Sequence, residues 1–126
     1  MEVIIRGEKL LKLGQSILKH NNVPNYNLDA RILLANLLSL ENKYFMSDIK
    51  VTNKDKEKFF SMIKDRVNGK PVSKIISKRA FWDAEFYINS STLDPRPDSE
   101  ILVESALEVN KLINKEKINI LELGVG

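Results

Sequence analysis

The last residues of the chain constrain its fold class more tightly than any other part of the sequence. From Ile118 to Gly126 they read Ile-Asn-Ile-Leu-Glu-Leu-Gly-Val-Gly. A short apolar run followed by Gly-x-Gly is typical of a buried parallel strand that enters a nucleotide-type binding loop, although an ordinary glycine turn after a buried strand is the alternative. Glycine lets such a loop turn sharply and approach a ligand closely. We therefore expect the chain to be the front part of a larger α/β protein.

Composition excludes several classes of site. The 126 residues contain no Cys and a single His, His20, so disulfides, thiolate zinc sites and a Ser/His/Asp triad are excluded. No apolar run approaches the roughly 20 residues that a membrane span requires. The N-terminus lacks the basic start and long apolar stretch of a signal peptide. These features predict a cytoplasmic protein with no metal site.

Helical periodicity dominates the first part of the chain. A first helix is predicted from Val3 to His20, with Gly14 on its apolar face, where a neighbouring helix can approach closely. A second is predicted from Leu28 to Leu38, with Asn27 as its N-cap, and it is apolar nearly all round. A helix of that kind belongs in the middle of a bundle.

The following segments extend this bundle. Tyr44 to Ser47 is predicted to form a short helical turn. Thr52 to Asp55 resembles a capping box that opens a long helix, and Gly69 ends that helix. Pro71 to Ile76 is predicted to be one further short helix. Residues 1–76 therefore read as a small antiparallel helical bundle.

After residue 76 the periodicity changes. Ala80 to Ile88 holds two short β-type runs around Asp83-Ala84, which suggests a hairpin. Leu93 to Pro97 is stiff because its two prolines fix φ. A helix is predicted from Pro97 to about Ile113, and a strand from about Ile118. The predicted fold is mainly α: a bundle over 1–76, a β-hairpin and linker over 77–97, and the first helix and strand of a Rossmann-like α/β domain over 98–126.

Charge is distributed unevenly although the net charge is only +3. Residues 50–79 carry ten Lys or Arg against three acids, whereas residues 80–110 carry one Arg against seven acids. The basic stretch is either a solvated helix face or a surface for an acidic partner. On the second interpretation, Lys54, Lys58 and Lys74 are expected to be exposed members of that surface.

Several segments together resemble one family, the protein-(glutamine-N5) methyltransferases of peptide-chain release factors (HemK/PrmC family). Leu93 to Glu104 reads Leu-Asp-Pro-Arg-Pro-Asp-Ser-Glu-Ile-Leu-Val-Glu and resembles the family's L-I-P-R-P-[DE]-T-E-x-L-V-E. Arg66 to Val72 resembles R-x-x-G-x-P-[VIL], and Asp29 to Leu34 resembles D-A-[RE]-x-L-L. Phe81-Trp82 with Phe86 resembles F-[WYF]-x-x-x-[FL], and Leu121 to Gly126 resembles the start of the S-adenosylmethionine loop.

The sequence also departs from the family pattern. Lys74 and Ser77 stand where the family usually has Tyr and Gly, and Asp94 replaces an apolar residue. Val125 replaces a small residue of the loop. The family's catalytic Asn-Pro-Pro-Tyr motif does not occur in the chain.

The resemblance implies methyl transfer from S-adenosylmethionine to a glutamine side-chain amide, with a release factor as partner. The cofactor-binding residues that it implies are Glu122, Gly124, Val125 and Gly126, together with Arg96 from the linker. Arg96 either faces the cofactor or substrate side of the cleft or forms a salt bridge with Asp98 or Glu100. No residue is assigned a catalytic role, so this chain alone is expected to be catalytically inert.

Other readings stay open. Phe81, Trp82 and Phe86 either line the cleft or form core at the hairpin. Asp29 and Arg31 are expected to be a structural polar pair at the edge of the bundle. A nucleic-acid-binding helical module is the competing function, although the basic residues are not interleaved with exposed aromatic residues. A free-standing structural bundle is a third reading, against which the closing Gly-x-Gly argues.

Overall fold

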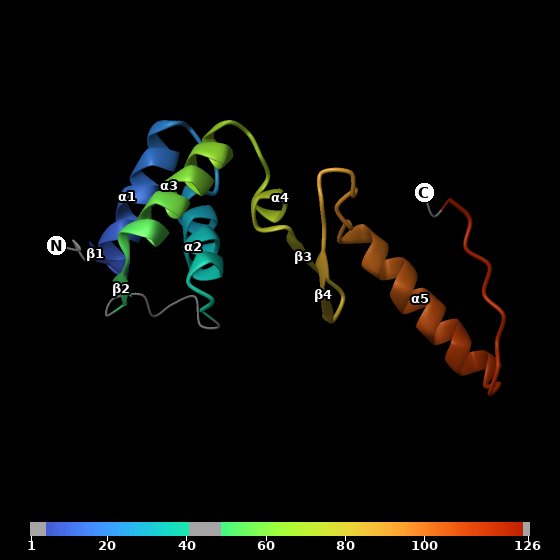
Figure 1. Cartoon of the computed structure of the whole chain (residues 1–126). Helices are drawn as coiled ribbons and strands as arrows, with labels where there is room; N and C mark the ends of the chain where they lie inside the picture. The colour runs from blue at the N-terminus through green and yellow to red at the C-terminus, as the bar shows by residue number, and fades with distance from the viewer. Residues whose placement is uncertain (1–4, 41–48, 125–126) are drawn as a thin grey trace.

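The fold is a helical bundle followed by a projecting hairpin and a long helix (Figure 1). It was obtained as a computed structural model that describes residues 5–40 and 49–124. Three helices, α1 (Gly7–His20), α2 (Tyr26–Leu37) and α3 (Asn53–Val67), pack against one another. The predicted turn at Tyr44 to Ser47 lies outside the described residues. No helix within the described ranges is long and apolar enough to cross a membrane.

The first helix begins later than Val3. Ile5–Arg6 forms a short strand, β1, which pairs antiparallel with β2 (Lys50–Val51). The Gly7 N–H then donates to the Ile49 carbonyl at 2.7 Å. The predicted start was wrong because β-branched residues next to a pairing partner favour extended backbone over helix.

The N-cap prediction for the second helix was also wrong. Asn25 occupies the cap, its side chain makes no capping hydrogen bond, and its carbonyl accepts the Asp29 N–H at 2.9 Å. The helix is not covered on all sides, since Leu28 is 56% exposed. Its buried face, which includes Leu33 and Leu34, lies against α1, α3 and α4.

The core of the bundle lies between α1, α2 and α3. Its largest fully buried side chains are Leu10, Leu18, Leu33, Leu34, Val51, Phe59 and Ile63. The predicted close approach at Gly14 is confirmed, because a Cβ added there would lie 2.5 Å from Phe59 Cζ and 3.2 Å from Ile63 Cδ1. Glycine is therefore required by the packing of α3 against α1.

The ends of α3 follow the sequence prediction. Thr52 Oγ1 accepts the Asp55 N–H at 3.2 Å and donates to the Asp55 carboxylate at 2.9 Å. This satisfies one of the free N–H groups at the start of the helix. Gly69 follows the helix with a φ of +91°, a conformation that glycine adopts without penalty.

A short helix, α4 (Val72–Ile76), leads into the predicted hairpin. Its strands are β3 (Lys78–Phe81) and β4 (Ala84–Tyr87), with Phe81 opposite Ala84. The two-residue turn is thus Trp82-Asp83, one residue earlier than the predicted Asp83-Ala84. Ser77 makes the bend before the hairpin in the left-handed region, with a φ of 57°, although it is not glycine.

The last helix, α5 (Asp98–Ile113), stands away from the bundle (Figure 1) and buries none of its residues. No strand is formed in residues 114–124, so the predicted strand and the Rossmann-like detail are not confirmed. A strand requires a hydrogen-bonding neighbour, and the described residues provide none for this segment. What is confirmed is a mainly helical fold with two small antiparallel sheets.

Candidate functional site

The linker between β4 and α5, residues 88–97, returns toward the bundle and lines an open pocket of about 450 Å³. Residues of α2, α3, α4 and β3 form one wall, and residues 90–96 form the other. Its charged lining residues are Asp29, Arg66, Lys74, Arg79, Asp94 and Arg96. The volume falls in the range of roughly 300–1,000 Å³ that is usual for ligand sites. We refer to this cavity as the hinge pocket.

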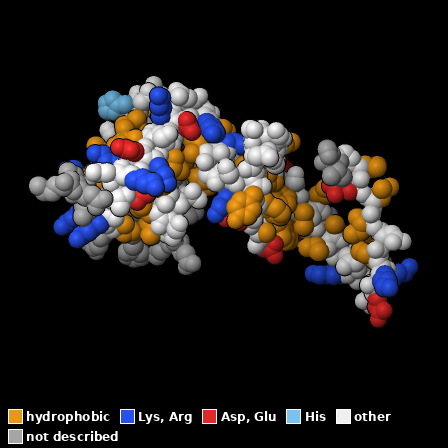
Figure 2. Space-filling model, in the orientation of Figure 1, with side chains coloured by type: hydrophobic (Ala, Val, Ile, Leu, Met, Phe, Trp, Pro, Cys, Tyr) orange, Lys and Arg blue, Asp and Glu red, His pale blue; other side chains and the backbone are white. Residues whose placement is uncertain are grey.

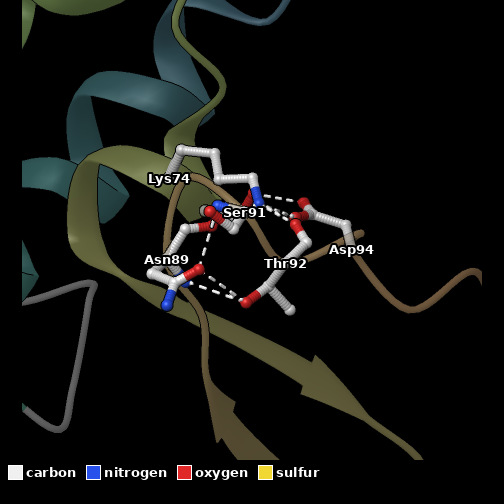
Figure 3. A network of polar contacts seen from close by, with 6 residues as sticks. Lys74, Asn89, Ser91, Thr92 and Asp94 are labelled. Atoms are coloured by element: carbon white, nitrogen blue, oxygen red, sulfur yellow. Dashed lines mark hydrogen bonds and ion pairs between the residues drawn. The ribbon is translucent and has the colours of Figure 1, made fainter. Parts of the chain in front are cut away.

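Lys74 holds the linker against the bundle (Figure 3). Its Nζ donates to the carbonyl of Asn89 at 2.7 Å and to the carbonyl of Thr92, and it lies 3.2 Å from Asp94 Oδ1. The two charged side chains are only 18% and 16% exposed. Lys74 thus makes two hydrogen bonds and one ion pair with a segment that begins 15 residues after it in the sequence.

Asp94 is fixed from a second direction by α4. The buried Ser73 hydroxyl donates to Asp94 Oδ2 at 2.5 Å. This hydrogen bond, with further contributions from Lys74 and Arg79, lowers the pKa of Asp94 against the opposing effect of burial. Asp94 Oδ1 has no hydrogen-bond donor within the described residues, so its charge is balanced by the Lys74 ion pair.

The first part of the linker, from Asn89 to Thr92, is held together by hydrogen bonds among its own residues (Figure 3). Asn89 Oδ1 accepts from the Ser91 N–H and from the Thr92 hydroxyl, both at 2.9 Å. Thr92 Oγ1 in turn accepts the Asn89 N–H at 3.3 Å. These bonds fix the loop whose carbonyls receive Lys74.

The sequence did not predict this network, although both charged residues of the ion pair had stood out in it. Lys74 and Asp94 were both departures from the family pattern, one toward positive charge and one toward negative charge. The structure pairs these two residues across one contact. The expectation that Lys74 belongs to an exposed surface was wrong, since its ammonium is engaged inside the pocket.

Asp29 and Arg66 form the other ion pair of the hinge pocket. Arg66 Nε lies 2.8 Å from Asp29 Oδ2, and the side chains are 21% and 10% exposed. The structure gives Asp29 a partner on α3, Arg66, whereas the predicted pairing of Asp29 with Arg31 stays a prediction. This contact joins two of the segments that carry the family resemblance.

The hairpin aromatic residues are not core. Trp82 is 44% exposed, Phe86 is 49% exposed and Tyr87 is 84% exposed, while Phe81 and Phe86 meet edge to face with ring centroids 6.3 Å apart. Hydrophobic side chains gather over this region in Figure 2. The Trp82 N–H donates to Glu100 Oε1 at 2.9 Å, which connects the hairpin turn to α5.

Arg96 reaches the hinge pocket rather than a neighbouring carboxylate. It forms no ion pair with any of the residues that the structure describes. Glu100, one of its two predicted partners, accepts the Trp82 N–H instead. The salt-bridge reading of Arg96 is thus not observed in residues 5–40 and 49–124.

The start of the predicted cofactor loop lies elsewhere. Glu122 is exposed, and Gly124 has a φ of +78°, as a sharp turn requires. Val125 and Gly126 lie outside the described residues. Glu122 and Gly124 do not line the hinge pocket, so the structure does not bring the predicted cofactor residues together with Arg96. Their role in cofactor binding stays a prediction.

An apolar groove runs between α5 and the segment that follows it. It has a volume of about 420 Å³, and its lining includes Leu102, Val109, Ile118 and Leu121. Leu121 is 84% exposed and Leu102 is 73% exposed. Within the described part of the chain, no cluster of His, Cys, Asp and Glu could hold a metal ion.

Comparison with known proteins agrees with these features. The chain matches the family described as the PrmC N-terminal domain over residues 9–76. It is 37% identical over 119 residues to a release factor glutamine methyltransferase of Leptospira interrogans, covering 93% of this chain and 41% of the relative. The corresponding protein of Clostridium botulinum is 35% identical, with 86% of this chain and 39% of the relative covered.

A third relative gives a match of similar extent. The release factor glutamine methyltransferase of Haemophilus influenzae is 32% identical over 124 residues, which cover 94% of this chain and 42% of that protein. The chain thus spans about two fifths of the length of the relatives it matches. It belongs to the PrmC N-terminal domain family and corresponds to the N-terminal part of a release factor glutamine methyltransferase.

Proposed function

We propose that this chain is the substrate-recognition part of an enzyme that methylates a glutamine side-chain amide in peptide-chain release factors, with S-adenosylmethionine as methyl donor. The observation that carries the proposal is the match of nearly the whole chain to proteins named release factor glutamine methyltransferase. We assign residues 1–76 to the recognition bundle, 77–97 to the hairpin and linker, and 98–126 to the start of the methyltransferase domain. The family match, which ends at residue 76, supports the first boundary.

The chemistry requires more than this chain contains. An amide nitrogen is a poor nucleophile because its lone pair is delocalised into the carbonyl. An enzyme must accept hydrogen bonds from its N–H groups and aim the nitrogen at the methyl carbon. The acceptors that the resemblance implies belong to an Asn-Pro-Pro-Tyr motif, which the sequence does not contain. We infer that the 126-residue chain alone transfers no methyl group.

The exposed apolar surface of α5 and its following segment suits docking against a methyltransferase core. Leu112 and Leu123 are 85% and 84% exposed, and no residue of α5 is buried. A helix with this much exposed apolar surface requires a partner. The partner we assign is the remaining sheet of the methyltransferase domain, because the relatives are more than twice as long as this chain. Glu122 and Gly124 would then begin the cofactor loop at that sheet.

A chimera tests this proposal directly. The chain is fused at Gly126 to the downstream part of the Leptospira interrogans relative and incubated with a release factor and labelled S-adenosylmethionine. The chimera should label the release factor, whereas the 126-residue chain and the downstream part should not when tested separately. A folded chimera that binds the cofactor but never labels the release factor contradicts the proposal. Tighter binding of the chain to RNA than to any release factor would favour the nucleic-acid module instead.

A further inference from the structure

The hinge pocket holds more positive charge than its own carboxylates balance. Four cationic side chains line it, Arg66, Lys74, Arg79 and Arg96, against only Asp29 and Asp94. Both carboxylates are already engaged, Asp29 by Arg66 and Asp94 by Ser73 and Lys74. The two remaining guanidinium groups, those of Arg79 and Arg96, form no ion pair with any described residue.

We propose that Arg79 and Arg96 form a carboxylate-binding site in the hinge pocket, which receives an acidic side chain of the protein substrate. This inference rests on the proposed function for the identity of the substrate. Guanidinium groups present a planar fork of donors that matches the geometry of a carboxylate. The pocket of about 450 Å³ is large enough for a Glu or Asp side chain with its flanking backbone.

The backbone positions of the two arginines favour such a site. Arg79 lies on β3 in register with Phe86, so the hairpin ladder fixes its Cα. Arg96 stands between Pro95 and Pro97, which fix φ on either side of it. Since both residues are held by rigid backbone, binding an anion costs little additional backbone ordering.

Asp94 lines the same pocket but is already engaged by residues of α4. Its carboxylate is already neutralised by Lys74 and accepts from Ser73, so it does not cancel the charge of the two arginines. Arg79 lines the pocket, and its charge makes a small contribution to the lowered pKa of Asp94. A ligand carboxylate would therefore lower the excess positive charge of the pocket, where four cationic side chains face two carboxylates.

The test uses the full 126-residue chain and two probes, a bacterial release factor and a capped peptide containing two adjacent glutamates. Nitrogen-detected NMR should show shifts of the Arg79 and Arg96 Nε–H resonances on addition of the glutamate peptide, and none with its glutamine counterpart. Arg79→Gln/Arg96→Gln should weaken binding of both probes at least tenfold. Lys9→Gln/Lys111→Gln, a control that removes the same charge from exposed positions, should change binding less than twofold.

Each outcome decides a different point. Arg79→Lys/Arg96→Lys keeps the charge but removes the planar fork of donors, so it should weaken binding, though less than the glutamine variant does. Thermal unfolding of each variant checks that the chain still folds. If the release factor binds and Arg79→Gln/Arg96→Gln weakens that binding no more than Lys9→Gln/Lys111→Gln does, the hinge-pocket inference is overturned while the proposed function stands. If the glutamate peptide binds in an arginine-dependent way but no release factor does, the pocket holds and the proposed function falls. Arginine-dependent binding of a short RNA that exceeds binding of the peptide would overturn the carboxylate assignment.

Discussion

Arg66 Nε lies 2.8 Å from Asp29 Oδ2, so one partly buried ion pair ties the last turn of α3 to the first turn of α2. Charge-assisted hydrogen bonds in partly desolvated positions contribute more than exposed ion pairs. A double-mutant cycle with Asp29→Ala and Arg66→Ala should give a coupling free energy of about 1–3 kcal/mol in urea unfolding. The same cycle on the exposed Glu8–Lys12 pair should give a clearly smaller coupling. Equal coupling free energies for the two pairs would mean that burial does not strengthen the Asp29–Arg66 pair.

Gly14→Ala should destabilise the bundle despite the higher helix propensity of alanine. The new Cβ would meet the Phe59 ring, which is fully buried and cannot move aside. Overpacking of this kind costs about 1–3 kcal/mol, which exceeds the ~1 kcal/mol that alanine gains over glycine in a helix. Ser16→Ala, on the exposed face of the same helix, should be neutral or slightly stabilising. Phe59→Leu in the Gly14→Ala background should recover part of the loss, and a stable single variant would contradict the close approach.

Asp94 should make the linker sensitive to acid. Its pKa in the folded protein lies below the ordinary value of 3.8, first because of the Ser73 hydrogen bond and then because of Lys74. A carboxyl with a depressed folded-state pKa contributes stability that is present above the unfolded-state pKa and is lost as pH falls through the folded-state pKa. Asp94→Asn should therefore lower the free energy of unfolding at neutral pH. When the free energy of unfolding is plotted against pH, the curves of the wild-type chain and of Asp94→Asn should converge at the acid end.

Asp83→Asn is the matched control for that experiment, because it removes an exposed carboxylate from the hairpin turn. Its free energy of unfolding is measured at the same pH values, and at neutral pH it should differ less from that of the wild-type chain than that of Asp94→Asn does. NMR shifts of Asn89 and Thr92, whose carbonyls receive Lys74, report the same transition locally. Parallel curves for the wild-type chain and Asp94→Asn down to the acid limit would exclude the ion pair as the source of the acid sensitivity.

Ser77→Gly should stabilise the fold. Ser77 has a φ of 57°, where a side chain raises the backbone energy by roughly 1–2 kcal/mol. Part of that gain is lost to the larger chain entropy of glycine in the unfolded state, so a net increase of about 0.5–1 kcal/mol in the free energy of unfolding is expected. Ser90→Gly, at a loop position without positive φ, should destabilise slightly. A loss of stability in Ser77→Gly would show that the serine side chain makes a contribution of its own.

The exposed lysines of α3 are expected to steer a release factor toward the bundle. Lys54→Glu/Lys58→Glu should weaken binding of the chain to a release factor and reduce its salt dependence, with no change in thermal unfolding. Lys111→Glu/Lys115→Glu is the charge-matched control on the other part of the chain. Lys74→Glu should behave differently, because it would place a second carboxylate beside Asp94 and detach the linker. Equal weakening by the α3 variant and its control would show that net charge alone is responsible.

Local patterns in the sequence predicted much of the fold. The Thr52 cap, the close approach at Gly14 and the hairpin all follow from residue types within a few positions of one another. The start of α1 was misplaced because its neighbour, β2, is remote in sequence. The strand at Ile118 was not confirmed because its formation requires pairing partners that the described residues do not supply.

The candidate site was less predictable. Arg96 was identified from its place between two prolines, but the contact of Lys74 with Asp94 depends on how the linker folds back on the bundle. A charged residue in place of an apolar one does not show which other residue it contacts. The sequence analysis therefore predicted no contact between Lys74 and Asp94.

The linker is fastened at both ends by polar contacts. Ser73 and Lys74 hold Asp94 to the bundle, and the Trp82 N–H holds Glu100 at the start of α5. Between these anchors lie two prolines, which leave the chain few torsions to change. The direction of α5 is therefore set by a stiff linker with a polar contact at each end, and not by a packed interface. High ionic strength or a single charge removal at either anchor should widen the spread of angles between the bundle and α5, while each part keeps its own internal structure.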